Sequence, residues 1–430
     1  MDDKFDVIVV GAGLAGCAAA YKLVKEGLSV VVIERGQYSG SKNLSGGVLY
    51  GRVMAELIPE FWEEAPVERF INKQILTFMT GDSSFSIDFK TQAFSQTPYN
   101  GFTVLRAKFD RWLADKTEEA GAMMVPGIKV DRLLKEENRI VGIVAGDEEM
   151  KADVIIAADG ANSFLAQEAG LRGRIATNHI AVGVKELIEL PRQVLEDRFN
   201  LTDNEGAAYG IVGYATRGVS GGGFLYTNTD SISIGVVMHL DELIKTGIKP
   251  AEVIEDFLAH PMIAPLIKGG KLLEYGAHLV PEGGVAMMPH LYTDGMLVVG
   301  DAAGLTVNNG LAVRGMDLAI GSGIAAAEAI LEIKPKGDFS AQALSAYQKR
   351  LEDSFVMKDM RLYANATHFM ENARLYEAYP QMLTGLMTDL FRQESQPKEH
   401  ILPSLLQSVK ESKVSLVDLA LDGFKGVRQL

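Results

Sequence analysis

The segment that most limits the fold of this 430-residue chain lies close to its N-terminus. Residues 6–10 form a continuous apolar run, typical of a strand that is buried on both faces of a parallel sheet. The alanine-rich residues 17–26 then predict a helix that ends at Gly27, and residues 28–34 predict a second buried strand that ends in an acid. This order predicts a βαβ unit with a right-handed crossover, and therefore a parallel sheet.

The turn between the first strand and the helix has the spacing of a dinucleotide-binding fingerprint. Gly11 permits the tight turn, Gly13 lets backbone approach a pyrophosphate, and Gly16 lets the helix pack close to the strand. The free N–H groups of the helix N-terminus favour phosphates. Glu34 is placed to accept hydrogen bonds from a ribose and disfavours a 2′-phosphate, so NAD or FAD is expected over NADP. The contacts expected from this unit are Gly11, Gly13, Leu14, Ala15, Gly16, Glu34 and Arg35.

Two later apolar runs end in a polar pair. Residues 154–158 lead into Asp159 and Gly160, and residues 296–299 lead into Gly300 and Asp301. Both are typical of sheet strands that deliver a polar residue to a ligand. For Asp159, a helix N-cap is an equally good interpretation.

Between these two runs the spacing of the apolar residues changes. Residues 231–236 alternate with period two, and residues 224–227 precede them, which predicts antiparallel strands. We expect an α/β protein with a discontinuous nucleotide-binding domain at residues 1–174 and 286–335. An antiparallel β domain at residues 175–285 is inserted in it, and a helical C-terminal region follows at residues 336–430.

Composition excludes several classes of function. The net charge of −14 leaves no basic stripe for nucleic acid, so no nucleic-acid partner is expected. One cysteine, Cys17, cannot form an internal disulfide or hold an iron–sulfur cluster. No signal peptide or spanning helix is evident, so we expect a cytoplasmic protein whose membrane contact is peripheral. The seven histidines show no metal or hydrolase pattern, and no metal site is expected.

The three polar motifs together resemble the glutathione-reductase-like flavoprotein superfamily. Residues 300–304, Gly-Asp-Ala-Ala-Gly, resemble its second FAD fingerprint, in which Asp301 would hold the ribityl chain, and Asp159-Gly160 resembles its middle motif. After residue 315 a small-residue helix is expected to about residue 332. Its first N–H groups, near Gly315 and Met316, would face the flavin with help from Arg314. The alternative is a glycine-rich helix selected only for close packing.

Other segments resemble the electron transfer flavoprotein–quinone oxidoreductase family, and its short FixC-type members in particular. The resemblance is carried by residues 42–50, 184–187, 221–228, 260–261, 269–271, 274–278, 281–284 and 314–320. It implies a glutathione-reductase-like fold with bound FAD, contacted also by Ser45, Gly46 and Arg106, and a quinone that approaches from the inserted domain. The flavin would be the redox centre, with no catalytic side chain.

One departure from that family concerns its partners. The longer members carry a C-terminal four-cysteine cluster domain, which this chain lacks. The FixC-type resemblance implies a separate small ferredoxin-like iron–sulfur subunit and two electron transfer flavoprotein-like subunits. Together they would form an NADH-oxidising, electron-bifurcating FixABCX-type complex on the inner face of the cell membrane. A second nucleotide site is not expected, because Gly321-Ser322-Gly323 lies within a helix and follows no strand, so NAD(P)H is not expected to be the direct donor.

A stripe of apolar residues in the C-terminal region could meet a membrane or a partner. The alternative is that this stripe packs on the flavin domain. Pro380 suits the first helical turn of this segment. The stripe consists of Leu375, Tyr379, Met382, Leu383, Leu386, Met387, Leu390 and Phe391.

Three other functions are alternatives to this one. A geranylgeranyl-reductase-like flavoenzyme would share the fold, but its Tyr-x-Trp-x-Phe-Pro pattern is replaced here by Gly-Gly-Phe-Leu-Tyr. An aromatic hydroxylase is disfavoured because Gly304 follows Gly-Asp-Ala-Ala where those enzymes place a histidine. A non-catalytic FAD-binding scaffold subunit is the third possibility.

Overall fold

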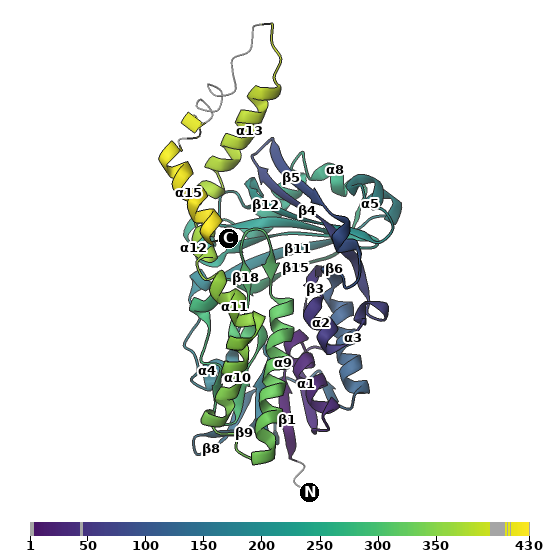
Figure 1. Ribbon diagram of the computed structural model, residues 1–430, viewed down its shortest axis with the longest axis vertical. Helices are drawn as coiled ribbons and strands as arrows, with labels where there is room; N and C mark the ends of the chain where they lie inside the picture. Colours follow the sequence, from purple (N-terminus) through teal and green to yellow (C-terminus); the bar gives the residue numbers. More distant parts are fainter. Residues whose placement is uncertain (1–3, 44–45, 396–408, 411, 413, 430) are drawn as a thin grey trace.

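Two sheets, one above the other, make up the body of the molecule (Figure 1). The structure, a computed structural model, describes residues 4–43, 46–395, 409–410, 412 and 414–429. In Figure 1 the first sheet lies in the lower half, among long helices, and the second sheet lies in the upper half. Helices α13 and α15 lie at the upper left of this view.

The first sheet is mainly parallel and contains the predicted βαβ unit. Its strands, in spatial order, are β16 (Tyr292–Thr293), β17 (Met296–Val298), β10 (Glu148–Ala157), β1 (Phe5–Val10), β2 (Val30–Glu34) and β7 (Met123–Pro126). From β17 to β7 every neighbouring pair is parallel, so these strands end at one edge of the sheet. An antiparallel extension of β10 is formed by β8 (Arg132–Glu136) and β9 (Arg139–Ala145).

Helices cover this sheet at close range. The predicted first helix is α1 (Leu14–Lys25), and the predicted small-residue helix is α9 (Met316–Ile333). A Cβ atom on Gly323 of α9 would lie 2.3 Å from the carbonyl oxygen of Ala15 in α1, so only glycine allows this approach. Close packing therefore accounts for the glycines at 321 and 323 within α9. The other covering helices are α3 (Arg106–Glu119), which packs on α1, and α10 (Ala341–Asp353), which packs on α9.

The second sheet has nine strands and is mainly antiparallel. Its path runs β15 (Lys271–Pro281), β11 (Ile180–Glu189), β14 (Ser231–His239), β13 (Gly221–Thr227), β12 (Glu205–Gly213), β4 (Val67–Met79), β6 (Gly101–Leu105) and β3 (Gly46–Tyr50), with β5 (Ser84–Lys90) paired to β4. The antiparallel pair β13–β14 confirms the prediction made from residues 224–236.

Four strands of this sheet come from outside residues 175–285. The strands β3 to β6 lie within residues 46–105, which the sequence analysis kept with the nucleotide-binding segment 1–174. They join through the parallel pair β4–β12, in which Ile71 is opposite Gly206. Such a pairing between distant segments leaves no local sequence signal, and for this reason the strands were not assigned to the second sheet.

One face of the second sheet packs on short helices. Side chains of β11, β12 and β14 form a core there, with Val184 and Ile234 among its buried members. Because side chains alternate along a strand, Lys185 lies on the opposite face of β11. The short helices near this sheet are α5 (Arg192–Phe199), α6 (Leu240–Thr246), α7 (Pro250–Ala259) and α8 (Ala264–Ile267).

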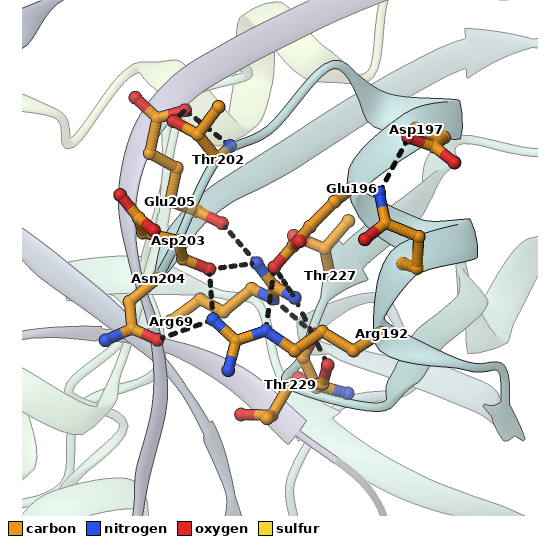
Figure 2. A network of polar contacts seen from close by, with 12 residues as sticks. Arg69, Arg192, Glu196, Asp197, Thr202, Asp203, Asn204, Glu205, Thr227 and Thr229 are labelled. Carbon is orange, nitrogen blue, oxygen red and sulfur yellow. Dashed lines mark hydrogen bonds and ion pairs between the residues drawn. The ribbon is translucent and has the colours of Figure 1, made fainter.

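A buried arginine ties β4 to the segments around it. Arg69 is 1% exposed, and its guanidinium donates hydrogen bonds to the backbone carbonyl oxygens of Asp203, Glu205, Asn228 and Thr229. A further hydrogen bond runs to Glu196 of α5, at 3.3 Å. Figure 2 shows Arg69 and the more exposed Arg192 converging on Glu196 and on the Asp203 carbonyl. This network fixes β4 against β12 and α5.

The C-terminal region is largely helical, as predicted. Its helices are α11 (Phe355–Leu362), α12 (Ala366–Met370), α13 (Ala378–Phe391) and α15 (Leu416–Gln429). Pro380 lies in the first turn of α13, as expected. Tyr379 and Met382 of the predicted stripe are buried in a small core of their own, and α13 packs on β4 and β5, whereas Phe391 is exposed. The remaining short elements are α2 (Arg52–Leu57), α4 (Phe164–Glu168), β18 (Val307–Asn308) and β19 (Val313–Arg314).

Candidate functional site

The strand ends of the first sheet meet one face of the second sheet around a cavity of about 690 Å³. The turn after β1, Glu34 at the end of β2, Asp159 after β10 and Asp301 after β17 all line this cavity. The carboxyl edge of a parallel sheet is where ligands bind in open α/β folds. The motifs found in the sequence are therefore brought together at one place.

The glycine turn makes a smooth wall for the cavity. Gly11 has a φ of +107°, and a Cβ there would lie 2.2 Å from the carbonyl oxygen of Ala158. A Cβ on Gly16 would lie 2.0 Å from the carbonyl oxygen of Gly11, so Gly16 serves close packing and does not line the cavity. At Gly13, in contrast, no atom lies within 4 Å of a Cβ position. Gly13 thus leaves an open cradle at the N-terminus of α1, where N–H groups face the cavity.

Glu34 is held in place by backbone donors. Its Oε2 accepts a hydrogen bond from the N–H of Ala12 at 3.0 Å, and its Oε1 accepts one from the N–H of Gly36. Each carboxylate oxygen can accept a second hydrogen bond, so Glu34 retains the capacity to bind hydroxyl groups. Leu14, Ala15 and Arg35 also line the cavity.

Asp159 lines the cavity and also binds the first turn of α4. Its Oδ2 accepts the N–H of Leu165 at 3.0 Å, although the N-cap residue of that helix is Ser163. Its Oδ1 is buried and has no hydrogen-bond partner among the described residues. Burial raises the pKa of this carboxyl group. A buried acceptor without a partner, on a residue that lines a cavity, fits a ligand donor.

Asp301 and Arg106 lie on facing elements. Gly300 does not line the cavity, but its N–H donates to Ser322 of α9 and so positions Asp301, which does. Burial raises the pKa of Asp301, while the charge of Arg106 opposes that shift. Arg106 is bidentate to Asp110, with both N···O distances at 2.7 Å. A charged guanidinium thus lines the cavity with its orientation fixed.

Helix α9 points its N-terminus at the cavity. Gly315 and Met316 line it, and the helix dipole favours negative charge at this end. Arg314 lines it too, but its guanidinium is bound to Asp317 and Asp359. These two carboxylates compensate its charge, so its electrostatic effect on a ligand is smaller than the sequence suggested.

The second sheet supplies residues that the sequence analysis did not select. The aromatic rings of Phe224 and Tyr226 stack with centroids 4.9 Å apart, and both line the cavity with Lys185, His278 and Glu282. Burial raises the pKa of Glu282 to about 7, lowers that of Lys185 to about 8 and lowers that of His278. All five lie in segments that carry the family resemblance, but the sequence does not show which of their side chains face the cavity.

Most of the predicted contacts therefore share one cavity. The exceptions are Gly16 and Gly300, which pack behind the wall, and Ser45, which lies outside the described residues. Gly46 and Gly160 do line it.

The parallel sheet, its glycine turn and the family match of this segment together define the chain as an FAD-dependent oxidoreductase. Residues 6–78 match the family model "FAD dependent oxidoreductase". A solved geranylgeranyl bacteriochlorophyll reductase-like protein from Thermoplasma acidophilum shares the fold, with a TM-score of 0.72, 22% identity and coverage of 95% of this chain and 96% of that one. The flavin-dependent brominase Bmp2 does so with a TM-score of 0.63, 18% identity and coverage of 95% and 99%.

The chain belongs to the electron transfer flavoprotein–quinone oxidoreductase (ETF-QO)/FixC family. Residues 180–280 match the model "ETF-QO, ubiquinone-binding", and residues 366–430 match "ETF-QO/FixC family C-terminal domain". The probable electron transfer flavoprotein-quinone oxidoreductase YdiS of Escherichia coli K12 and the FixC protein of Salmonella typhi are each 45% identical over 429 residues, covering all of both chains. The FixC protein of Bradyrhizobium diazoefficiens is 42% identical over 93% of this chain and 92% of its own.

In the part of the chain that the structure describes, no helix has the length and apolar character needed to span a bilayer.

Proposed function

We propose that this protein binds one FAD in the cavity and passes electrons from an electron transfer flavoprotein-like partner to ubiquinone. The observation that supports this most directly is that one cavity joins the glycine turn of the first sheet to strands β11 to β15. Those strands run through the segment that matches the ubiquinone-binding model, residues 180–280. A flavin and a quinone would therefore lie in the same space.

The residues fit an FAD. The open cradle at Gly13 suits a pyrophosphate against the N-terminus of α1. Glu34 has free acceptor capacity for a ribose, and Asp301 and the orphaned Oδ1 of Asp159 offer acceptors to hydroxyl or N–H donors further along. Gly315 and Met316 would then lie at the ring end, where the dipole of α9 favours the negative charge of the reduced flavin.

The bound flavin would supply the conversion between one-electron and two-electron transfer. The protein would supply binding, orientation and electrostatics. Phe224 and Tyr226 would provide an apolar surface on the second sheet for a quinone ring. The reaction itself needs no nucleophilic side chain.

The partners are part of the proposal. FixC-type membership suggests two electron transfer flavoprotein-like subunits, a small ferredoxin-like iron–sulfur subunit and an NADH-oxidising, electron-bifurcating assembly of FixABCX type. We further propose that the protein is cytoplasmic and contacts the inner face of the cell membrane, because its quinone substrate is dissolved in lipid.

The test is oxidation of the chemically reduced protein by a short-chain ubiquinone in the absence of air. We expect about one FAD per chain and rapid return of the oxidised flavin spectrum when the quinone is added. A non-catalytic scaffold would hold FAD without reoxidation by quinone. An enzyme of the geranylgeranyl-reductase type would instead saturate a prenyl chain, which mass spectrometry of the added isoprenoid would detect.

NADH added to the isolated protein is the control for the electron source. We expect no rapid flavin reduction, because the described residues form no second dinucleotide turn beside the cavity. Rapid reduction would contradict delivery of electrons by a partner.

A further inference from the structure

Lys185 is a charged residue on β11, the strand next to the edge strand β15 of the second sheet. It lies at the centre of β11, on the face that lines the cavity, while its neighbour Val184 packs in the core on the other face. The residues opposite it on the two adjacent strands are both glycines, Gly235 on β14 and Gly276 on β15. On the β14 side the ring of Phe224 takes the place of a side chain, because a Cβ on Gly235 would lie 2.8 Å from Phe224 Cζ.

Within the described part of the chain, the ammonium of Lys185 has no acidic partner. No hydrogen bond or ion pair joins its Nζ to any residue that the structure describes, and Nζ lies 5.7 Å from the centroid of the Phe224 ring. The titratable groups that face it are Arg106 from α3, His278 from β15 and Tyr226 from β13. Of these only Arg106 is a permanent charge, and it is positive.

This environment makes the ammonium easy to deprotonate. Burial is the main cause and the charge of Arg106 the second, and together they lower the pKa of Lys185 to about 8. A group with a pKa near the working pH is best suited to donate a proton in a reaction.

The proposed reaction leaves one proton to be supplied. Conversion of a quinone to a quinol adds two electrons and two protons, and a reduced flavin brings two electrons and one proton. We propose that Lys185 donates the second proton from Nζ to a carbonyl oxygen of the quinone. An N–H bond of the ammonium breaks and an O–H bond of the quinol forms, which leaves a neutral amine that regains a proton from water. This inference rests on the proposed function.

Other groups on the cavity wall are less suited to this transfer. Arg106 does not release a proton. Burial raises the pKa of the Tyr226 hydroxyl and lowers the pKa of His278 below its usual 6.5. At neutral pH the tyrosine therefore holds its proton, and the histidine is a neutral imidazole, whose remaining N–H is a far weaker acid than an ammonium. Glu282 is the competitor to be tested, although Asn308 holds its side chain by a hydrogen bond.

The experiment compares five forms of the holoprotein: wild type, Lys185→Met, Lys185→Arg, Glu282→Gln and Glu186→Gln. Glu186 is the matched control, because it changes charge on the same strand but on the opposite face. Each protein is reduced chemically and mixed with a short-chain ubiquinone in an anaerobic stopped-flow instrument between pH 6 and 10, and flavin reoxidation is followed.

For wild type we expect the rate constant to fall about tenfold per pH unit above about pH 8, because only the ammonium donates. Lys185→Met should be slower by about 100-fold at pH 7 and show no break there. Lys185→Arg should be similarly slow, since it keeps the charge but cannot release a proton. Glu186→Gln should behave as wild type.

A second readout does not depend on turnover. The rate at which an amine-selective reagent modifies Lys185 is measured against pH in the oxidised holoprotein, by peptide mass spectrometry. We expect half-maximal reactivity near pH 8, below the usual lysine range. Half-maximal reactivity above pH 10 would overturn the inference.

Several kinetic results would also overturn it. A fast Lys185→Arg protein would assign a purely electrostatic effect to the lysine, and a pH break that survives in Lys185→Met would place the donor elsewhere. Loss of the break in Glu282→Gln would assign the proton to Glu282. A wild type that does not react with ubiquinone contradicts the proposed function itself, whereas a reactive wild type with an equally reactive Lys185→Met contradicts only the inference.

Discussion

At the scale of single residues, Gly13 is the position where the absence of a side chain matters most for a ligand. A valine there would extend into the open cradle at the start of α1, where the pyrophosphate is expected. We expect Gly13→Val to fold but to lose at least about 90% of its FAD, a fall in affinity of tenfold or more. Flavin absorbance per mole of purified chain measures this.

Gly385→Val is the control for that experiment. Gly385 also has no atom within 4 Å of a Cβ position, but it lies in α13 and does not line the cavity. It should retain the FAD content of wild type. Equal FAD in Gly13→Val would contradict the placement of the phosphates.

The buried carboxyl group of Glu282 makes the stability of the protein depend on pH. Burial raises its pKa to about 7, so the folded state binds its proton more tightly than the unfolded state does. The free energy of unfolding therefore falls as pH rises from about 4.5 to about 7. Glu282→Gln removes this loss and should stabilise the protein by about 1–3 kcal/mol at pH 8. At pH 4.5 the two proteins should unfold alike. Tm values at both pH values test this, and equal Tm differences at the two would contradict it.

At the scale of elements, Arg69 holds the join between distant strands. Replacing it with methionine removes the guanidinium that donates to the carbonyl oxygens of Glu205, Asn228 and Thr229, whereas Arg192 still donates to Glu196 and to the Asp203 carbonyl. We expect a loss of about 3–5 kcal/mol in the free energy of unfolding. Arg192→Met is the control in the same network, because Arg192 has a side chain that is 49% exposed and should cost about 1 kcal/mol or less. Urea denaturation distinguishes the two, and similar losses would mean that burial is not the cause.

The helices and strands also differ in how well the sequence predicts them. The unit β1–α1–β2 was predicted because its contacts are between neighbours in sequence and its strands are apolar throughout. Asp159 and Asp301 were selected because each directly follows such a strand. The pairing of β4 with β12 and the inward orientation of Lys185 depend on register between distant segments. Register between distant segments is decided by tertiary packing, which a single sequence does not display.

At the scale of the whole molecule, helix α15 carries the apolar surface that the sequence analysis had sought on α13. Leu416, Val417, Leu421, Phe424 and Val427 are all more than half exposed. On its other side Asp422 is buried and accepts hydrogen bonds from Asn372, Arg374 and Tyr379. This anchor holds α15 with its apolar side chains exposed.

We expect this face of α15 to make the membrane contact of the proposed function, because its exposed side chains are apolar. Each large apolar side chain that enters a membrane contributes about 1.5–3 kcal/mol. Phe424→Glu combined with Val427→Glu should therefore lower binding to phosphatidylcholine vesicles at least about tenfold in cosedimentation. The binding of wild type should persist at high salt, because a net charge of −14 leaves apolar contact as the driving force.

Ile244→Glu, at a residue that is 64% exposed on α6, adds a similar charge elsewhere and should bind as wild type does. If the double variant binds vesicles as wild type does, the membrane contact is not on α15. Since both substitutions lie on the outer side of a helix that is held by Asp422, the rate of quinone reduction in detergent should not change.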